Sequence, residues 1–74
     1  MTMFSLNEIR EWGFVHTKDG GESYYTLLLE PNDPFWGDYL IAEWFDKGCY
    51  VIHHNTDKEP LNELEVLEII DKYK

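Results

Sequence analysis

The sequence contains few features that could cross-link a small fold or anchor it in a membrane. Its single cysteine, Cys49, excludes an internal disulfide, and no segment approaches the roughly 20 apolar residues that a membrane-spanning helix needs. The first ten residues, MTMFSLNEIR, show no basic segment followed by an apolar stretch, so we expect no signal peptide. These absences favour one cytoplasmic domain that spans residues 1–74.

Positive charge is scarce and unevenly placed. Six Lys and Arg residues stand against 15 Asp and Glu residues, and none of the six lies between Lys18 and Lys47. Binding to a phosphate backbone requires cationic groups that release counterions, so we expect no direct binding to nucleic acid. The net charge of −9 favours a basic protein partner, although high charge also serves simply to keep a small protein soluble.

Catalytic and metal-binding motifs are also absent from the sequence. It contains no glycine-rich phosphate loop and no Gly-x-Ser-x-Gly turn. His53 and His54 are adjacent in a predicted strand, so they point to opposite faces and do not converge on one metal ion with Cys49. We therefore expect no enzymatic activity, no cofactor and no metal site.

One helix is predicted near each end of the chain. In the N-terminal helix, Ser5 and Glu8 form a Ser-x-x-Glu capping box, and Gly13 ends the helix. In the C-terminal helix, Pro60 is expected as the first helical residue, and an apolar stripe follows with the period of a helix. The stripe consists of Leu61, Leu64, Val66, Leu67, Ile70 and Tyr73.

The middle of the chain predicts four strands, at residues 14–17, 22–30, 38–46 and 49–55. A short connection joins the last two, so residues 38–54 are predicted to form a β-hairpin. The order of elements is α-β-β-β-β-α. We therefore expect an α+β fold, in which a short N-terminal helix and an amphipathic C-terminal helix pack on one face of a small antiparallel sheet of three to four strands.

The connector PNDPFWGDYL, residues 31–40, has an unusual composition for a loop. Pro31 and Pro34 each fix the backbone φ angle, so Phe35 and Trp36 are expected on a preorganised loop. Aromatic anchors surrounded by polar groups are typical of an interaction hot spot, and a rigid loop lowers the entropy cost of binding. The alternative is that one of the two rings folds back and plugs the end of the core.

The predicted partner-binding surface combines this loop with the acidic residues around it. Phe35 and Trp36 are the expected anchors, while the carboxylates provide complementary charge and fast association. Tyr24, Tyr39 and Tyr50 are expected to extend the surface across the open face of the sheet. The predicted partner-binding residues are Glu30, Asp33, Phe35, Trp36, Asp38, Glu43 and Asp46.

In size, acidity and α+β layout, the chain resembles the small accessory proteins encoded by bacteriophages and mobile elements, including anti-CRISPR and anti-restriction proteins. Several members of that group are acidic and mimic nucleic acid. The resemblance covers the whole chain and carries no motif, so it assigns no role to an individual residue. It implies a stoichiometric inhibitor or adaptor that acts by binding. The alternative is a homodimeric structural or regulatory subunit, whose surplus aromatic residues fill a self-interface.

Overall fold

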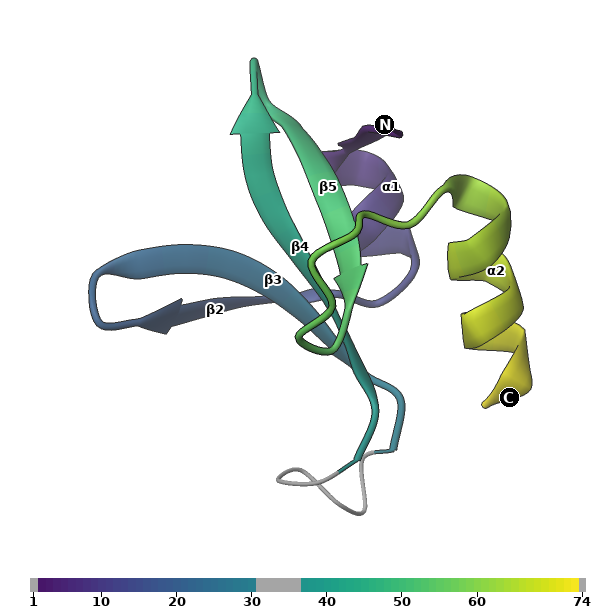
Figure 1. Cartoon of the computed structure of the whole chain (residues 1–74). Coiled ribbons are helices and arrows are strands. Elements are labelled where there is room, and N and C mark those ends of the chain that lie inside the picture. The colour runs from purple at the N-terminus through teal and green to yellow at the C-terminus, as the bar shows by residue number, and fades with distance from the viewer. Residues whose placement is uncertain (1, 31–36, 74) are drawn as a thin grey trace.

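The chain forms one antiparallel sheet and two helices (Figure 1). The computed structural model describes residues 2–30 and 37–73. The strands are β1 (Phe4–Ser5), β2 (Val15–Asp19), β3 (Glu22–Leu28), β4 (Tyr39–Asp46) and β5 (Cys49–His54), and the helices are α1 (Leu6–Glu11) and α2 (Glu63–Lys72). Neither helix in these ranges has the length and apolar character needed to cross a membrane.

The sheet confirms the predicted α+β fold, but it has five strands instead of three or four. The strand order is β1-β5-β4-β3-β2, and all neighbouring strands are antiparallel. The strand that the sequence did not predict is β1, in which Phe4 pairs with Tyr50 and Ser5 pairs with Cys49. A two-residue strand directly before a helix is too short to show the alternating pattern by which strands are predicted.

Helix α1 begins and ends where the sequence predicts. The Ser5 hydroxyl accepts a hydrogen bond from the Glu8 amide (3.2 Å), and the Glu8 carboxylate accepts one from the Ser5 amide (3.2 Å), which completes the capping box. After the helix, Gly13 has a φ of 100°, a left-handed conformation that favours glycine. The Phe14 amide then donates to the Ile9 carbonyl (3.1 Å), so the chain leaves the helix and turns directly towards β2.

Helix α2 begins later than the sequence predicts, so the expectation that Pro60 is its first residue was wrong. The Leu61 amide donates to the Ile52 carbonyl (2.7 Å), which holds the chain beside β5 before the helix begins. Asn62 is the N-cap: its side-chain oxygen accepts from the Glu65 amide (2.8 Å), and the Glu65 carboxylate accepts from the Asn62 amide (3.0 Å). This second capping box fixes the start of the helix.

The face that α2 buries matches the predicted stripe in part. As predicted, Val66 is buried and Leu61, Ile70 and Tyr73 pack against the core; Ile69, which was not predicted, joins them. Leu64 and Leu67, which were predicted to face the core, are 67% and 42% exposed. The helix carries apolar side chains on two adjacent faces, and the contacts at its two ends decide which of them is buried.

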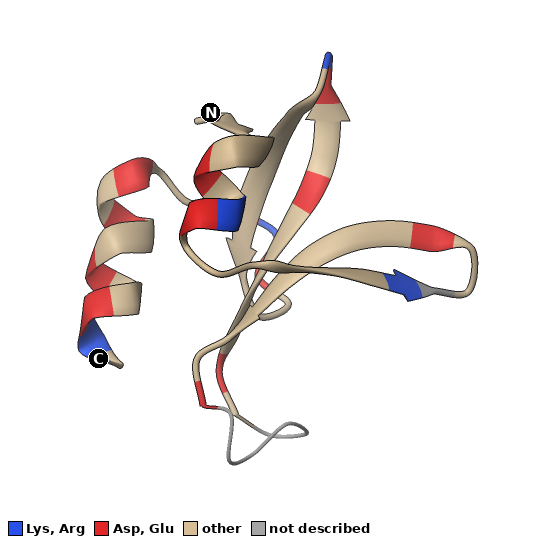
Figure 2. Ribbon diagram, turned by 180° about the vertical axis from the view of Figure 1, so that it is seen from behind, with Lys and Arg blue, Asp and Glu red and all other residues tan. Residues whose placement is uncertain are grey.

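Both helices cover the same face of the sheet and leave the other face open (Figures 1 and 2). Each helix contributes a fully buried side chain to a shared core, Ile9 from α1 and Val66 from α2. This arrangement confirms the predicted packing of both helices on one face. The other buried residues of this core are Phe4, Phe14, Leu29, Leu40, Ala42 and Ile52.

Candidate protein-binding surface

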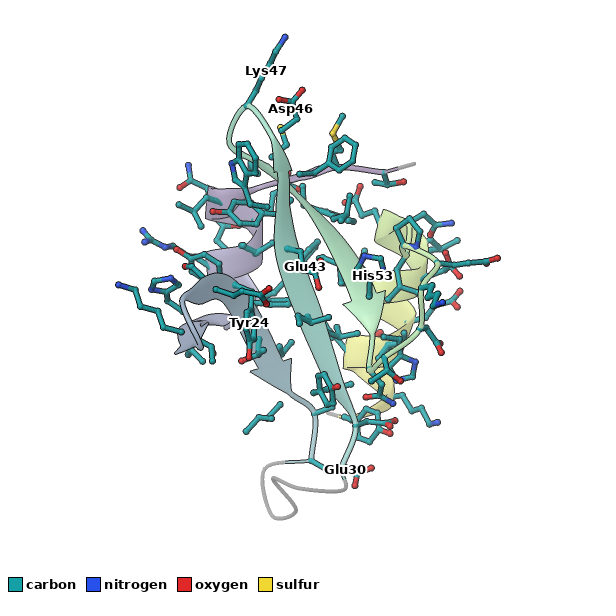
Figure 3. All side chains as sticks on the ribbon, turned by 60° about the vertical axis from the view of Figure 1, so that its left-hand side comes forward. Tyr24, Glu30, Glu43, Asp46, Lys47 and His53 are labelled. Atoms are coloured by element: carbon teal, nitrogen blue, oxygen red, sulfur yellow. The ribbon has the colours of Figure 1, made fainter. Side chains whose placement is uncertain are left out.

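The uncovered side of the sheet presents a connected set of side chains from three strands. Thr26, Ile41 and His53 lie side by side across β3, β4 and β5, because Ile41 is paired with each of the other two. Glu43 follows Ile41 by two residues, so it lies on the same side of β4. Figure 3 shows Glu43 and His53 on this side, with Tyr24 on the neighbouring hairpin. We call these five residues the open face.

The histidines and tyrosines divide between the two sides of the sheet. His53 lies on the open face, whereas His54 lies on the helix side, where its Nε2 is 3.5 Å from the Asp38 carboxylate. Tyr50 was expected on the open face, but it packs against the core and meets Tyr25 edge-to-face at 5.5 Å. In the described ranges, no group of three or more His, Cys, Asp or Glu side chains is placed to hold a metal ion.

A hollow of about 380 Å³ lies on the open face and is open to solvent. It contains an exposed carboxylate from Glu43 and, on its rim, the charged side chains of Asp57 and Lys58. A site of this shape suits the side chains of a protein partner better than a reaction that requires water to be excluded. The lining residues are Tyr39, Ile41, Glu43, His53, Asn55, Thr56, Asp57 and Lys58.

The hairpin formed by β4 and β5 is strongly twisted at its tip. Its two turn residues, Lys47 and Gly48, have positive φ angles of 49° and 78°, as a two-residue type I′ turn requires, and this confirms the predicted hairpin. The register shifts between Trp44 and Asp46, which marks a β-bulge. A bulge bends its strand and increases the local twist, so the tip of this hairpin turns away from its neighbour.

β3 and β4 pair along only part of their length. The last pair is Tyr25 with Ala42, and beyond it the β2–β3 and β4–β5 hairpins diverge (Figure 1). Residues 22–24 of β3 and 43–46 of β4 lie on the two sides of this opening, which we call the hairpin fork. Within the described part of the chain, no strand pairs with residues 43–46 on the side of β3. The backbone there is a free strand edge.

Two aromatic side chains are exposed at the hairpin fork. Trp44 is 59% exposed and Phe45 is 47% exposed. Exposed aromatic rings beside carboxylates have the composition of an interaction hot spot. Trp44 also lines a hollow of about 410 Å³, which lies in the fork. The lining residues are Glu22, Ser23, Tyr24, Glu43 and Trp44.

Asp38 lies at the other end of β4, in a network of hydrogen bonds. The Tyr73 hydroxyl donates to one oxygen of its carboxylate, and the Asn55 side-chain amide donates to the other (3.1 Å). These two hydrogen bonds hold the pKa of Asp38 below its usual value. The same carboxylate raises the pKa of Tyr73 to about 12. Asp38 therefore anchors the C-terminal end of α2 to the beginning of β4.

The structure describes four of the seven predicted partner-binding residues, and they are spread over the length of the sheet. Figure 3 shows Glu30 at one end, Glu43 in the middle and Asp46 at the tip of the opposite hairpin. All three side chains are exposed, whereas Asp38 is partly buried by its hydrogen-bond partners. The remaining three lie outside the described residues: Asp33, Phe35 and Trp36.

No protein-family model, no curated protein and no solved structure matches this chain. Its own surface is therefore the guide to its function. That surface offers exposed carboxylates at Glu22, Glu43 and Asp46, a free strand edge and exposed aromatic rings.

Proposed function

We propose that this chain is a non-catalytic protein-binding module, a stoichiometric inhibitor of a basic nucleic-acid-handling protein. The observation that carries this proposal is the position of Glu43 in the middle of an uncovered sheet face. Glu22 and Asp46 are exposed on adjoining strand segments, and no Lys or Arg occurs between Lys18 and Lys47. A surface of this charge attracts a cationic patch and speeds the encounter with it.

Inhibition then follows from competition for the same cationic side chains. A nucleic-acid-handling protein positions its ligand mainly through contacts from Lys, Arg and polar groups to phosphates. The carboxylates of Glu30, Glu43 and Asp46 extend from one end of the sheet to the other (Figure 3), so they can engage several such groups at once. Because Glu43 and Asp46 lie on one strand, β4, which is paired with β5, the backbone that carries these carboxylates needs little ordering on binding.

Two variants of equal net charge test this proposal. The first replaces Glu22, Glu30 and Glu43 by Gln and Asp46 by Asn, which removes four exposed carboxylates from the sheet and changes the net charge from −9 to −5. The matched control makes the same change in charge with four exposed residues elsewhere: Glu11→Gln, Glu59→Gln, Glu63→Gln and Glu68→Gln. Each form is immobilised and exposed to a bacterial lysate at low and moderate salt, and the retained proteins are identified and quantified.

The proposal predicts that the wild type and the control retain a basic nucleic-acid-handling protein, and that the sheet variant loses it. Retention should also decrease as the salt concentration rises, because exposed charges are screened. The purified partner should then lose its nucleic-acid binding when the wild-type chain is added in equimolar amount. If all three forms retain the same proteins, or none, the acidic sheet is not the binding surface.

A homodimeric structural or regulatory subunit is the second candidate, and the exposed leucines of α2 favour it. Leu64 and Leu67 border a hollow of about 490 Å³ on the outer side of the helix, next to Thr2. A second copy could cover these side chains, because the burial of apolar surface away from water is favourable. Sedimentation at several protein concentrations separates the two candidates. A dimer that dissociates in the Leu64→Gln, Leu67→Gln variant supports self-association, and a monomer at all concentrations excludes it.

A further inference from the structure

We infer that the hairpin fork binds an extended, Arg- or Lys-rich segment of the partner, which adds to β4 as a further antiparallel or parallel strand. This inference rests on the proposed function and specifies the shape and chemistry of the partner segment. It concerns residues 22–24 and 43–46, which line the fork. Three features carry it: a free backbone edge, carboxylates on both sides of the opening, and an exposed tryptophan.

The free edge is the first of these features. In an antiparallel sheet, successive residues direct their backbone N–H and C=O groups alternately to the two neighbouring strands. β4 continues to pair with β5 beyond the fork, since Glu43 pairs with Val51 and Trp44 with Tyr50. On its other side, β3 has diverged after Tyr25, so within residues 2–30 and 37–73 this edge has no strand beside it. A free edge is a template on which an extended peptide adds as a strand.

The outer edges of the sheet are less suitable for the same ligand. On the outer side of β5, β1 pairs with Tyr50, and the Leu61 amide donates a hydrogen bond to the Ile52 carbonyl. β2 has a free outer edge, but that strand carries Lys18 and no acid before its last residue, Asp19. A basic segment therefore finds complementary charge at the fork and not at β2.

Charge and aromatic character at the fork specify the chemistry of the added strand. Glu22 and Glu43 are exposed on opposite sides of the opening and line the same hollow. Alternate side chains of a strand point to the same face, so basic residues at every second position would meet these carboxylates. Trp44 follows Glu43 directly and so projects to the opposite face of β4, where its ring, 59% exposed, is available to pack against the intervening side chains of the added strand. The segment that fits is therefore extended and basic at alternate positions.

A synthetic peptide tests the inference with the full chain. The probe is a ten-residue peptide of alternating Arg and Thr, and its uncharged control has Gln in place of Arg. Two further versions carry N-methyl groups on the amides of either the Arg or the Thr residues, so each has one of its two hydrogen-bonding edges blocked. Binding is followed by backbone NMR, through chemical shifts and hydrogen exchange of the amides of residues 43–46. Glu43→Gln is compared with Glu68→Gln, an exposed residue of α2 far along the chain from the fork.

The expected result has three parts. The Arg peptide binds and slows hydrogen exchange at residues 43–46, while the Gln peptide does not. At least one N-methylated version binds about tenfold more weakly, which corresponds to the loss of one or two hydrogen bonds. Glu43→Gln weakens binding of the Arg peptide, and Glu68→Gln leaves it unchanged.

Other results overturn the inference and separate it from the proposed function. If both N-methylated peptides bind as well as the parent, the peptide binds through charge alone, and strand addition is wrong while the acidic surface stands. If the Arg peptide does not bind, the fork is not its site, and the lysate experiment still decides the proposed function independently. If exchange at residues 43–46 slows with rising protein concentration and no peptide, a second copy occupies the fork.

Discussion

The hydroxyl of Tyr73 donates a hydrogen bond to the carboxylate of Asp38, 35 residues away in the sequence. This contact joins the end of α2 to the beginning of β4. Asn55 completes the network, because its amide donates to the same carboxylate (3.1 Å) and its side-chain oxygen accepts from the Tyr39 amide (2.9 Å). With its last turn held in this way, α2 presents Val66 to the core and leaves its leucines exposed.

Removing the Tyr73 hydroxyl should destabilise the fold. In Tyr73→Phe, the Asp38 carboxylate loses the hydrogen bond that contributes most to its lowered pKa. We expect a lower thermal midpoint than for the wild type, measured by circular dichroism. Tyr24→Phe, on the open face, is the matched control and should leave the midpoint unchanged. Equal midpoints for the two variants would show that the contact does not contribute to stability.

The same contact predicts how stability depends on pH. The folded state raises the pKa of Tyr73 from 10.0 to about 12, so between these values the unfolded chain releases this proton first and stability falls as pH rises. For Asp38, whose pKa is lowered from 3.8, the contribution is complete above 3.8 and is lost as pH falls through the folded-state value. Urea unfolding of the wild type and of Tyr73→Phe between about pH 9 and about pH 12 should show a steeper decline of the free energy of unfolding with rising pH in the wild type. Parallel curves would contradict this assignment.

The start of α2 can be tested by comparing Asn62 with Pro60. Asn62→Ala removes the side chain that accepts from the Glu65 amide, and we expect it to lower the free energy of unfolding by about 1 kcal/mol. Pro60→Ala lies outside the helix and should change it by about 0.5 kcal/mol or less. Urea denaturation measures both. A larger effect at Pro60 would mean that the helix begins there.

Two pairs of aromatic residues are candidates for anchoring the partner: Trp44 with Phe45, and Phe35 with Trp36. Trp44→Ala with Phe45→Ala should reduce partner binding by about 2 kcal/mol, the loss typical of a hot-spot residue, with little change in stability because both rings are about half exposed. Phe35→Ala with Trp36→Ala tests the loop that the sequence predicts as an anchor. Binding of the captured partner to each double variant is measured by calorimetry. If the Trp44→Ala, Phe45→Ala variant binds the partner with the affinity of the wild type, the hairpin fork is not part of the interface.

Features of the fold that depend on neighbouring residues were predicted well from the sequence. The capping box at Ser5 and Glu8 and the two-residue turn at Lys47 and Gly48 are set by hydrogen bonds and φ angles within a few positions. The sequence also contained the signal for the true start of α2. Asn62 and Glu65 have capping-box spacing, two residues after the start that Pro60 predicts.

Features that depend on distant residues could not be predicted in this way. By periodicity, Leu64 and Leu67 fit the apolar stripe of α2 as well as the residues that are buried, and their exposure depends on distant contacts such as that of Tyr73 with Asp38. Likewise, the strand pattern around Trp44 gives no sign that β3 and β4 diverge beyond the Tyr25–Ala42 pair. The free edge and its exposed rings follow from the relative twist of two hairpins, which local periodicity does not encode.

Hydrogen–deuterium exchange of the chain alone and in complex with the captured partner tests the central claim most directly. If the partner binds the open face and the hairpin fork, amides in residues 22–26 and 39–46 should exchange more slowly in the complex, while those in 63–72 should not change. Slower exchange confined to residues 63–72 would contradict the account, because the interface would then lie on α2 and its exposed leucines.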